Sequence, residues 1–243
     1  MSNPKKSSKS KVQYYILDGL VLIVAAVFTI VAISFNTSKE NPSALLPGDS
    51  ASTEAKIPTS IDSTTGAIVV GSSSNVLEEY FDFGCPHCGA YNAVYGADVQ
   101  KFVEDGKLTL KMYPLGMLDA SFMGTRFSTR SAAALYCVAE NDPNSVFSFV
   151  EKMFASQPDE GTRGLSDDQI IDIAKSANAT NSANCITSGT YKDFVSAKTK
   201  SVIYSDWFKG TPSLILNGTL INTSSVIGAI TASIPEATAT PTP

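Results

Sequence analysis

The chain has 243 residues, of which 43% are hydrophobic and 17% are charged, and its formal net charge is −5. This length suits one good-sized domain with accessory segments, and four cysteines are too few for a disulfide-dense scaffold. Four lysines lie in the first eleven residues, which leaves the remainder with 14 basic and 23 acidic residues, or about −9. A domain this acidic has no electrostatic footprint for nucleic acid, so no nucleic-acid partner is expected.

The N-terminal segment predicts a membrane anchor. Residues 1–15 form a basic tail, and residues 19–35 are 17 consecutive residues without a charge. As a helix, residues 16–35 span about 30 Å, the thickness of a bilayer core. Lysines precede this run and none follows it immediately. This predicts a single pass through the cell membrane, with a cytoplasmic N-terminus and an extracytoplasmic catalytic domain. A cleaved signal ending near Ala32-Ile33-Ser34 is the alternative, although the run exceeds the usual ~7–15 apolar residues.

A folded domain is predicted between two irregular segments. Residues 36–65 are rich in Ser, Thr, Pro, Ala and Asn and predict a flexible linker, and residues 235–243 predict a disordered tail. The domain, residues 66–234, combines strands and helices. Strands are predicted at 67–71, 76–81, 107–113, 212–216 and 219–221, and helices at 127–140, 145–156, 166–177, about 191–205 and 224–234. The last two strands are joined by Asn217-Gly218, a hairpin signal.

The strand at 76–81 leads into Cys85-Pro86-His87-Cys88, and a helix is predicted to open at Gly89. Two cysteines three residues apart at a helix start lie on one side of its first turn. There the unpaired N–H groups and the helix dipole favour a thiolate, and His87, the only histidine, adds to this effect. This pattern predicts a redox-active dithiol, with Cys85 exposed and attacking and Cys88 as its buried partner. A zinc site usually needs four ligands in two close pairs, so no metal is expected.

The expected thiolate also predicts the direction of the reaction. A fall of the Cys85 pKa from about 8.5 to about 4 stabilises the reduced form by roughly 6 kcal/mol. For a two-electron couple this corresponds to on the order of 130 mV toward a stronger oxidant. The sequence therefore favours an oxidase over a reductase.

Several of these features together resemble the DsbA-type branch of the thioredoxin superfamily. They are the aromatic strand running into Cys85-Pro86-His87-Cys88, the helical block, and Gly210-Thr211-Pro212 opening a strand before Asn217-Gly218. The N-terminal segment resembles that of membrane-anchored members from Gram-positive bacteria, in particular actinobacteria. The resemblance covers about residues 66–234. It implies an α/β thioredoxin-like fold with a helical insert at about 117–206, preceded by a single transmembrane helix.

The resemblance also implies roles for residues outside the cysteine motif. The Thr211–Pro212 peptide bond is expected to be cis and to lie opposite the cysteines, which frees the Thr211 backbone to pair with an extended substrate. An ordinary strand-opening proline is the alternative. Glu79 stands where the family carries a buried acid, which could shuttle the proton of Cys88 and would have a raised pKa. Glu78 and Glu79 could instead be edge charges, although strand alternation lets only one of them face inward.

Cys137 and Cys185 remain as a second pair. In an exported domain they predict a structural disulfide that staples the insert, and a second redox relay is the alternative. Closing this loop of 48 residues stabilises a domain by roughly 4 kcal/mol in the chain-entropy model.

The sequence thus predicts an extracytoplasmic thiol–disulfide oxidoreductase that donates the Cys85–Cys88 disulfide to unfolded exported proteins through a mixed disulfide. The resemblance alone implies reoxidation by a membrane quinone-linked reductase, DsbB- or VKOR-like. No cofactor is expected. The alternatives are a membrane-tethered reductase or isomerase and, from another class, a non-catalytic chaperone-like client-binding domain.

Overall fold

The computed structural model describes residues 56–234. The predicted basic tail, the membrane anchor, most of the linker and the C-terminal tail lie outside the described residues. Among residues 56–234, no helix is both long and apolar enough to cross a membrane.

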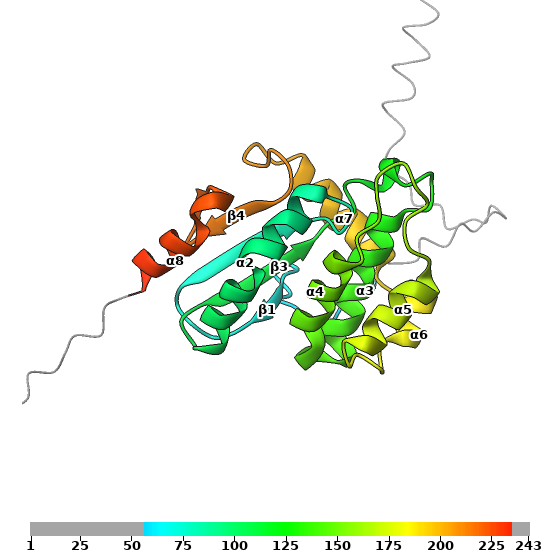
Figure 1. Cartoon of the computed structure of the whole chain (residues 1–243), viewed down its shortest axis with the longest axis horizontal. Helices are drawn as coiled ribbons and strands as arrows, with labels where there is room; N and C mark the ends of the chain where they lie inside the picture. Colours follow the sequence, from blue (N-terminus) through cyan, green and yellow to red (C-terminus); the bar gives the residue numbers. More distant parts are fainter. Residues whose placement is uncertain (1–55, 235–243) are drawn as a thin grey trace, which may run out of the picture. The chain divides into compact units, whose positions relative to one another are not determined.

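A five-stranded mixed sheet forms the centre of the domain (Figure 1). Its order is β1 (Ile68–Val70), β3 (Thr109–Pro114), β2 (Val76–Phe81), β4 (Ser213–Leu216) and β5 (Thr219–Ile221). The central strand β2 runs parallel to β3 and antiparallel to β4. Asn217 and Gly218 turn the β4–β5 hairpin with φ of 48° and 80°, as the expected type I′ turn requires. All five predicted strands are present, with small shifts at their ends.

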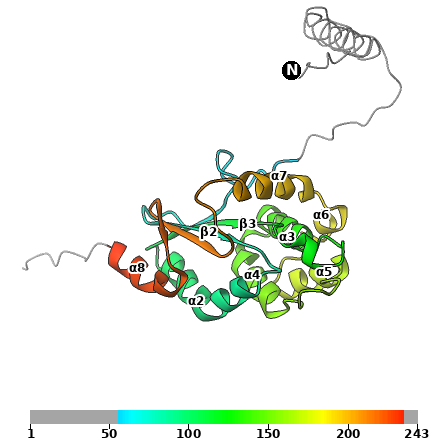
Figure 2. The same cartoon turned by 90° about the horizontal axis from the view of Figure 1, so that it is seen from above.

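Helices cover both faces of the sheet. The catalytic helix α2 (Pro86–Glu104) and α8 (Val226–Ser233) lie on one face, and α7 (Lys192–Ile203) lies on the other (Figure 2). Side chains of β2 alternate between the two faces of the sheet, so this strand contributes to two hydrophobic cores. Leu77 and Phe81 belong to the larger core, which includes residues of α2. Tyr80 belongs to a smaller core with Val202 of α7 and Phe208. The catalytic helix therefore rests on the central strand that leads into it.

Apart from α7, the helical insert packs beside one end of the sheet, as Figures 1 and 2 show. It contains α3 (Phe127–Asn141), α4 (Val146–Ala155), α5 (Asp167–Ser176), α6 (Ala183–Ser188) and α7. Helix α3 is buried almost all round and forms the centre of the insert. The predicted α/β fold with a helical insert is confirmed for the described residues. Two details differ from the prediction: α6 was not expected, and α2 begins at Pro86 instead of Gly89 because proline suits the first helical position.

Residues 56–65, the end of the predicted linker, contact the folded domain. The backbone N–H and the hydroxyl of Thr59 donate to the Glu140 carboxylate at 2.8 and 2.9 Å. Asp62 pairs with Lys111 on β3 at 3.2 Å, and Ile61 forms a bridge with Ile68. The folded domain therefore begins before the predicted boundary at residue 66.

A disulfide joins Cys137 in α3 to Cys185 in α6, with the two Cα atoms 5.7 Å apart. Next to it, Ser182 donates to the Cys137 carbonyl at 3.3 Å and to the Asp142 carboxylate at 2.5 Å. Both contacts tie the start of α6 to the end of α3. The predicted disulfide between these two cysteines is present, and it links two helices of the insert, α3 and α6.

Candidate active site

The two remaining cysteines sit at the start of α2. Cys85 is the N-cap residue and Cys88 lies in the first turn, where its N–H donates to the Cys85 carbonyl at 3.0 Å. Both are free thiols, 5% and 1% exposed. Cys85 is thus less accessible than predicted, and its thiol donates a hydrogen bond to the Thr211 carbonyl at 3.4 Å. Cys88 is buried, as predicted.

The two thiols differ strongly in acidity. The pKa of Cys85 is lowered to about 5, chiefly by the hydrogen bond with the Cys88 thiol and against the effect of burial. The Thr211 side chain and the backbone of Cys88 and His87 contribute to the same lowering of the pKa. Burial, followed by the proximity of Cys85, raises the pKa of Cys88 far above its ordinary value. The pair is therefore built to hold its negative charge on Cys85.

The Thr211–Pro212 loop lies against the cysteine pair from the β4 side. Its peptide bond is cis. The hydroxyl oxygen of Thr211 is buried and has no partner among the described residues, which leaves it free to donate to Cys85 when that sulfur is charged. This loop therefore contributes a carbonyl acceptor for the thiol and a hydroxyl donor for the thiolate.

Glu79 lies on β2 beneath Cys88 and lines the same small cavity. The Tyr91 hydroxyl donates to its Oε1 at 2.6 Å. The residue keeps some exposed surface, but its carboxyl group is enclosed, and this burial raises its pKa to about 7 although the bond from Tyr91 opposes the rise. Its neighbour Glu78 faces the other side of the sheet, where it accepts a hydrogen bond from Tyr80 at 2.9 Å. Strand alternation thus turns Glu79, and not Glu78, toward the cysteines.

Replacing Glu79 with glutamine is expected to stabilise the protein in a pH-dependent way. The folded pKa of about 7 lies above the ordinary value of 4.5, so the wild type loses stability as the pH rises from 4.5 to 7. Glutamine keeps an acceptor for Tyr91 and does not ionise. The variant should therefore match the wild type near pH 4.5 and exceed it by about 3 kcal/mol well above pH 7. Urea unfolding at both pH values measures this, and a gain independent of pH would contradict a buried, titrating Glu79.

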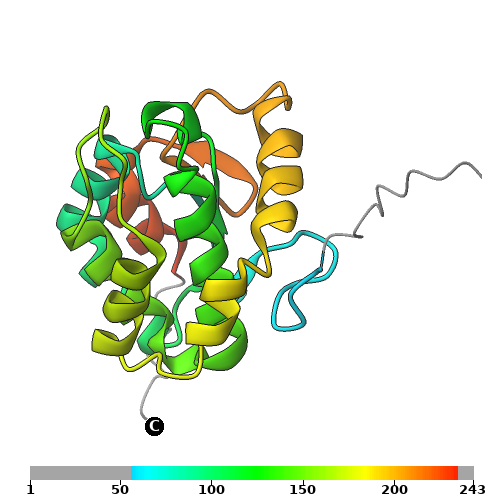
Figure 3. The same ribbon diagram turned by 90° about the vertical axis from the view of Figure 1, so that its right-hand side faces the viewer.

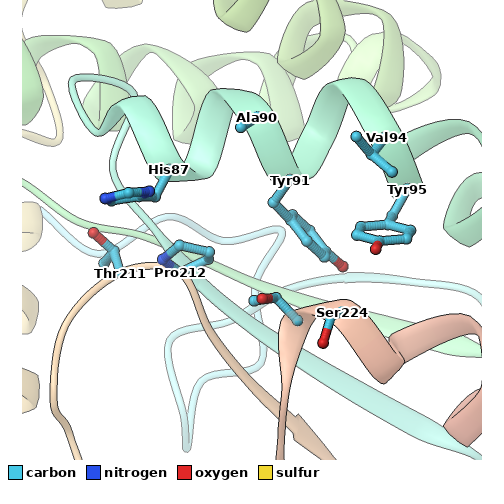
Figure 4. A pocket seen from close by; sticks show the side chains of 9 residues that line it. His87, Ala90, Tyr91, Val94, Tyr95, Thr211, Pro212 and Ser224 are labelled. Atoms are coloured by element: carbon cyan, nitrogen blue, oxygen red, sulfur yellow. The ribbon is translucent and has the colours of Figure 1, made fainter.

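An open groove runs along α2 beside the cysteines (Figure 4). His87 and Tyr91 on α2 face Thr211 and Pro212, and Tyr95, further along α2, faces Ser224. Val94, 64% exposed, adds an apolar side chain. The full lining is His87, Ala90, Tyr91, Val94, Tyr95, Thr211, Pro212, Thr223 and Ser224. Three of the predicted site residues, His87, Thr211 and Pro212, thus share one surface with aromatic side chains that the sequence did not single out.

Asp82 is a further buried acid that the sequence reasoning missed. It is fully buried three residues before Cys85, and it accepts from the Gly84 N–H at 2.7 Å and the Leu118 N–H at 2.9 Å. Burial raises its pKa to about 6. An acidic residue inside the apolar run before Cys85 was the available signal. Its two bonds join the catalytic loop to the start of the helical insert.

The described residues 56–234 contain no group of three or more side chains placed to hold a metal ion. A dithiol at a helix start, with one acidic and one buried thiol and the Thr211 carbonyl bonded to the first, lies on an α/β sheet with a helical insert. This combination defines a thiol–disulfide oxidoreductase of thioredoxin fold.

Comparisons with known proteins agree with this class. The family model described as thioredoxin matches residues 63–235, and the chain belongs to this family. Oxidised DsbA from Mycobacterium tuberculosis is 27% identical with a TM-score of 0.61, over 70% of this chain and 94% of that one. Reduced DsbG from the same organism gives the same identity and TM-score, over 70% and 89%. BdbD from Bacillus subtilis, 22% identical with a TM-score of 0.56 over 68% and 90%, shares the fold. The enzyme is a DsbA-like thiol–disulfide oxidoreductase.

Curated relatives match over shorter stretches. The serine/threonine-protein kinase PknE of Mycobacterium tuberculosis is 33% identical over 150 residues, which are 59% of this chain and 26% of that protein. Disulfide bond formation protein D of Bacillus subtilis is 30% identical over 99 residues, 40% of this chain and 42% of that protein. The chain thus spans about a quarter of the length of the kinases and under half of the second relative.

Proposed function

We propose that this oxidoreductase works as an oxidant, donating the Cys85–Cys88 disulfide to exported proteins. The observation that carries the proposal is the place of Cys85 at the N-terminus of α2 beside the Cys88 thiol, which lowers its pKa to about 5. This environment stabilises a thiolate, which exists only in the reduced protein. Stabilising the reduced form makes the disulfide a stronger oxidant.

The geometry supports a two-step exchange. A client thiolate attacks the Cys85 sulfur, so a mixed disulfide forms and Cys88 leaves with the electron pair. Because the Cys88 thiolate is strongly disfavoured, it takes up a proton, and the neutral Glu79 carboxyl in the same cavity is placed to supply it. A second client thiolate then attacks the client sulfur, and Cys85 leaves as a stabilised thiolate. Two electrons pass from two client thiols to the cysteine pair.

The groove along α2 is the proposed binding site for a segment of the client protein. It opens beside His87 and Pro212, next to the reacting sulfurs, and its walls combine aromatic rings with the hydroxyls of Thr223 and Ser224. Such a lining suits an extended, partly apolar segment of an unfolded chain.

We place the domain outside the cytoplasm, anchored by residues 16–35, with reoxidation by a membrane quinone-linked reductase. The sequence of the N-terminal segment and the presence of the Cys137–Cys185 disulfide support this location, since disulfides persist in oxidising compartments. Protease treatment of intact cells checks the orientation: the domain should be digested while cytoplasmic markers survive. A protected domain would contradict it.

The thiolate should be visible directly by titration. Thiolate absorbance near 240 nm in the reduced full-length protein is expected to rise with a midpoint near pH 5, and this rise should be absent from Cys85→Ser. The folded pKa is depressed below the unfolded value of about 8.5. The stability that the thiolate adds is therefore complete above that value and lost as the pH falls through 5. A midpoint near 8.5 would remove the basis of the proposed oxidant role.

The deciding experiment is the equilibrium of the Cys85–Cys88 pair with a glutathione redox series. A potential well above that of glutathione, with the reduced protein more stable than the oxidised one, is expected for an oxidant. A potential near thioredoxin's value of about −270 mV would instead indicate a reductase.

A further inference from the structure

Gln157 joins the helical insert to the catalytic turn, although it is 72 residues from Cys85 in the chain. Its side-chain Nε2 donates to the Phe83 carbonyl at 2.7 Å and to the Cys85 carbonyl at 2.9 Å. The two N–H groups of the amide thus bind two carbonyls of the turn that carries the attacking sulfur. The amide orientation follows from the partners, because a carbonyl oxygen can only accept.

Packing holds Gln157 in this place. It follows the end of α4, and its backbone N–H donates to the Phe154 carbonyl at 3.2 Å. The Phe154 ring lies 4.9 Å from Phe83 and 5.8 Å from Phe81, measured between ring centroids. The end of α4 is therefore anchored on the residues that lead from β2 into the catalytic loop.

Gly89 leaves the space that Gln157 occupies. A Cβ atom at position 89 would lie 2.5 Å from the Oε1 atom of Gln157, well inside contact distance. Glycine within a helix costs about 1 kcal/mol relative to alanine, and Gly89 lies within α2. The close approach of the Gln157 amide therefore explains why position 89 is a glycine despite this cost.

The contact acts on the charge at Cys85. Carbonyl oxygens carry partial negative charge, and those of Phe83 and Cys85 belong to the same turn as the sulfur. Donation by Gln157 offsets that charge and holds the two carbonyls toward the amide. We propose that Gln157 is a positioning residue through which the helical insert holds the catalytic turn and favours the thiolate of Cys85.

This inference rests on the proposed function only in taking Cys85 as the reacting sulfur. The test compares the full-length Gln157→Glu, Gln157→Ala and wild-type proteins. The titratable groups around the sulfur, Cys88 and His87 on α2 and the buried Asp82, stay unchanged in every variant. Gln100→Glu is the matched control, since Gln100 is an α2 side chain that bonds Glu104 on the surface.

Gln157→Glu should raise the midpoint of the Cys85 thiolate titration by about one pH unit, because a carboxylate cannot donate to the two carbonyls and adds negative charge beside them. The glutathione equilibrium should shift about tenfold toward the oxidised protein, since one pKa unit is a factor of ten. Gln157→Ala should move both quantities in the same direction by less, because water can replace the amide. The control should match the wild type in both.

Gly89→Ala provides an independent variant that leaves Gln157 chemically intact. It should displace the amide and raise the thiolate midpoint, and adding Gly89→Ala to Gln157→Ala should cause no further rise. This variant carries the test if Gln157→Glu does not fold. Unchanged midpoints in folded variants would overturn the inference while leaving the oxidant role intact. A wild-type midpoint near 8.5 would overturn the oxidant role, and the variants would still decide the inference by their difference from it.

Discussion

Cys85→Ser is expected to abolish disulfide transfer to a reduced, unfolded client protein, with a loss of at least about a thousandfold. A serine hydroxyl cannot form a disulfide, so no mixed disulfide can exist at position 85, and Cys88 cannot replace it because its sulfur is buried and its pKa is far above the ordinary thiol value. The rate at which thiols disappear from reduced ribonuclease, with the oxidised wild type as the reference, measures the loss.

Cys88→Ser is the informative companion variant. It keeps the attacking sulfur and removes its partner. Mixed with a client that carries a disulfide, its Cys85 thiolate should attack one client sulfur, and the other client sulfur should leave as a thiol. The resulting mixed disulfide should accumulate, because no Cys88 thiol is present to resolve it, and it should be visible as a higher-mass band without reductant. The Cys137–Cys185 disulfide is present in both variants and controls for nonspecific exchange. Full client-protecting activity in Cys85→Ser would instead favour a chaperone-like domain that binds clients without redox chemistry.

Removing the Cys137–Cys185 disulfide is expected to lower the free energy of unfolding by roughly 4 kcal/mol. The bond closes a loop of 48 residues that contains α4 and α5. Its loss enlarges the conformational freedom of the unfolded chain. This is a large share of the ~5–15 kcal/mol that holds a typical domain together. Urea unfolding of Cys137→Ala/Cys185→Ala, compared with its parent, measures the change.

The comparison should be made in a Cys85→Ser/Cys88→Ser background, so that only one disulfide is present. In the otherwise wild-type protein, the glutathione equilibrium of the catalytic pair should change less than twofold when the insert disulfide is removed. Unchanged stability together with lost oxidase activity would contradict the structural role and favour the alternative of a second redox relay.

The elements that sequence reasoning predicted correctly are those with strong local signals. The alternating strand at 107–113, Ser166 as the N-cap of the helix predicted at 166–177, and the Asn217-Gly218 turn each specify their structure within a few residues. Helix α6 has six residues and no side-chain cap, so it carries no comparable local signal. Its position depends on the disulfide and on packing against α3, which are contacts between distant parts of the chain.

The same distinction applies to the site. The cysteine motif is contiguous in sequence, so the chemistry of Cys85 and Cys88 could be predicted from the helix start alone. Three contacts arise only when separate elements meet: the bond from the Cys85 thiol to Thr211, the bond from Tyr91 to Glu79, and the contact of Gln157 with the catalytic turn. None of these has a spacing that a single sequence reveals.

The segment of residues 56–65 has a consequence for how large clients reach the enzyme. Lys56 lies over the Tyr191 ring, and Lys198 of α7 donates to the Thr65 carbonyl. The described chain therefore enters the domain beside α7, on the sheet face opposite α2 (Figures 2 and 3). The sheet therefore separates the entering segment, residues 56–65, from the groove along α2. A bulky, partly folded polypeptide can thus approach the cysteines without steric conflict with this entering segment, so client size should have little influence on the encounter rate.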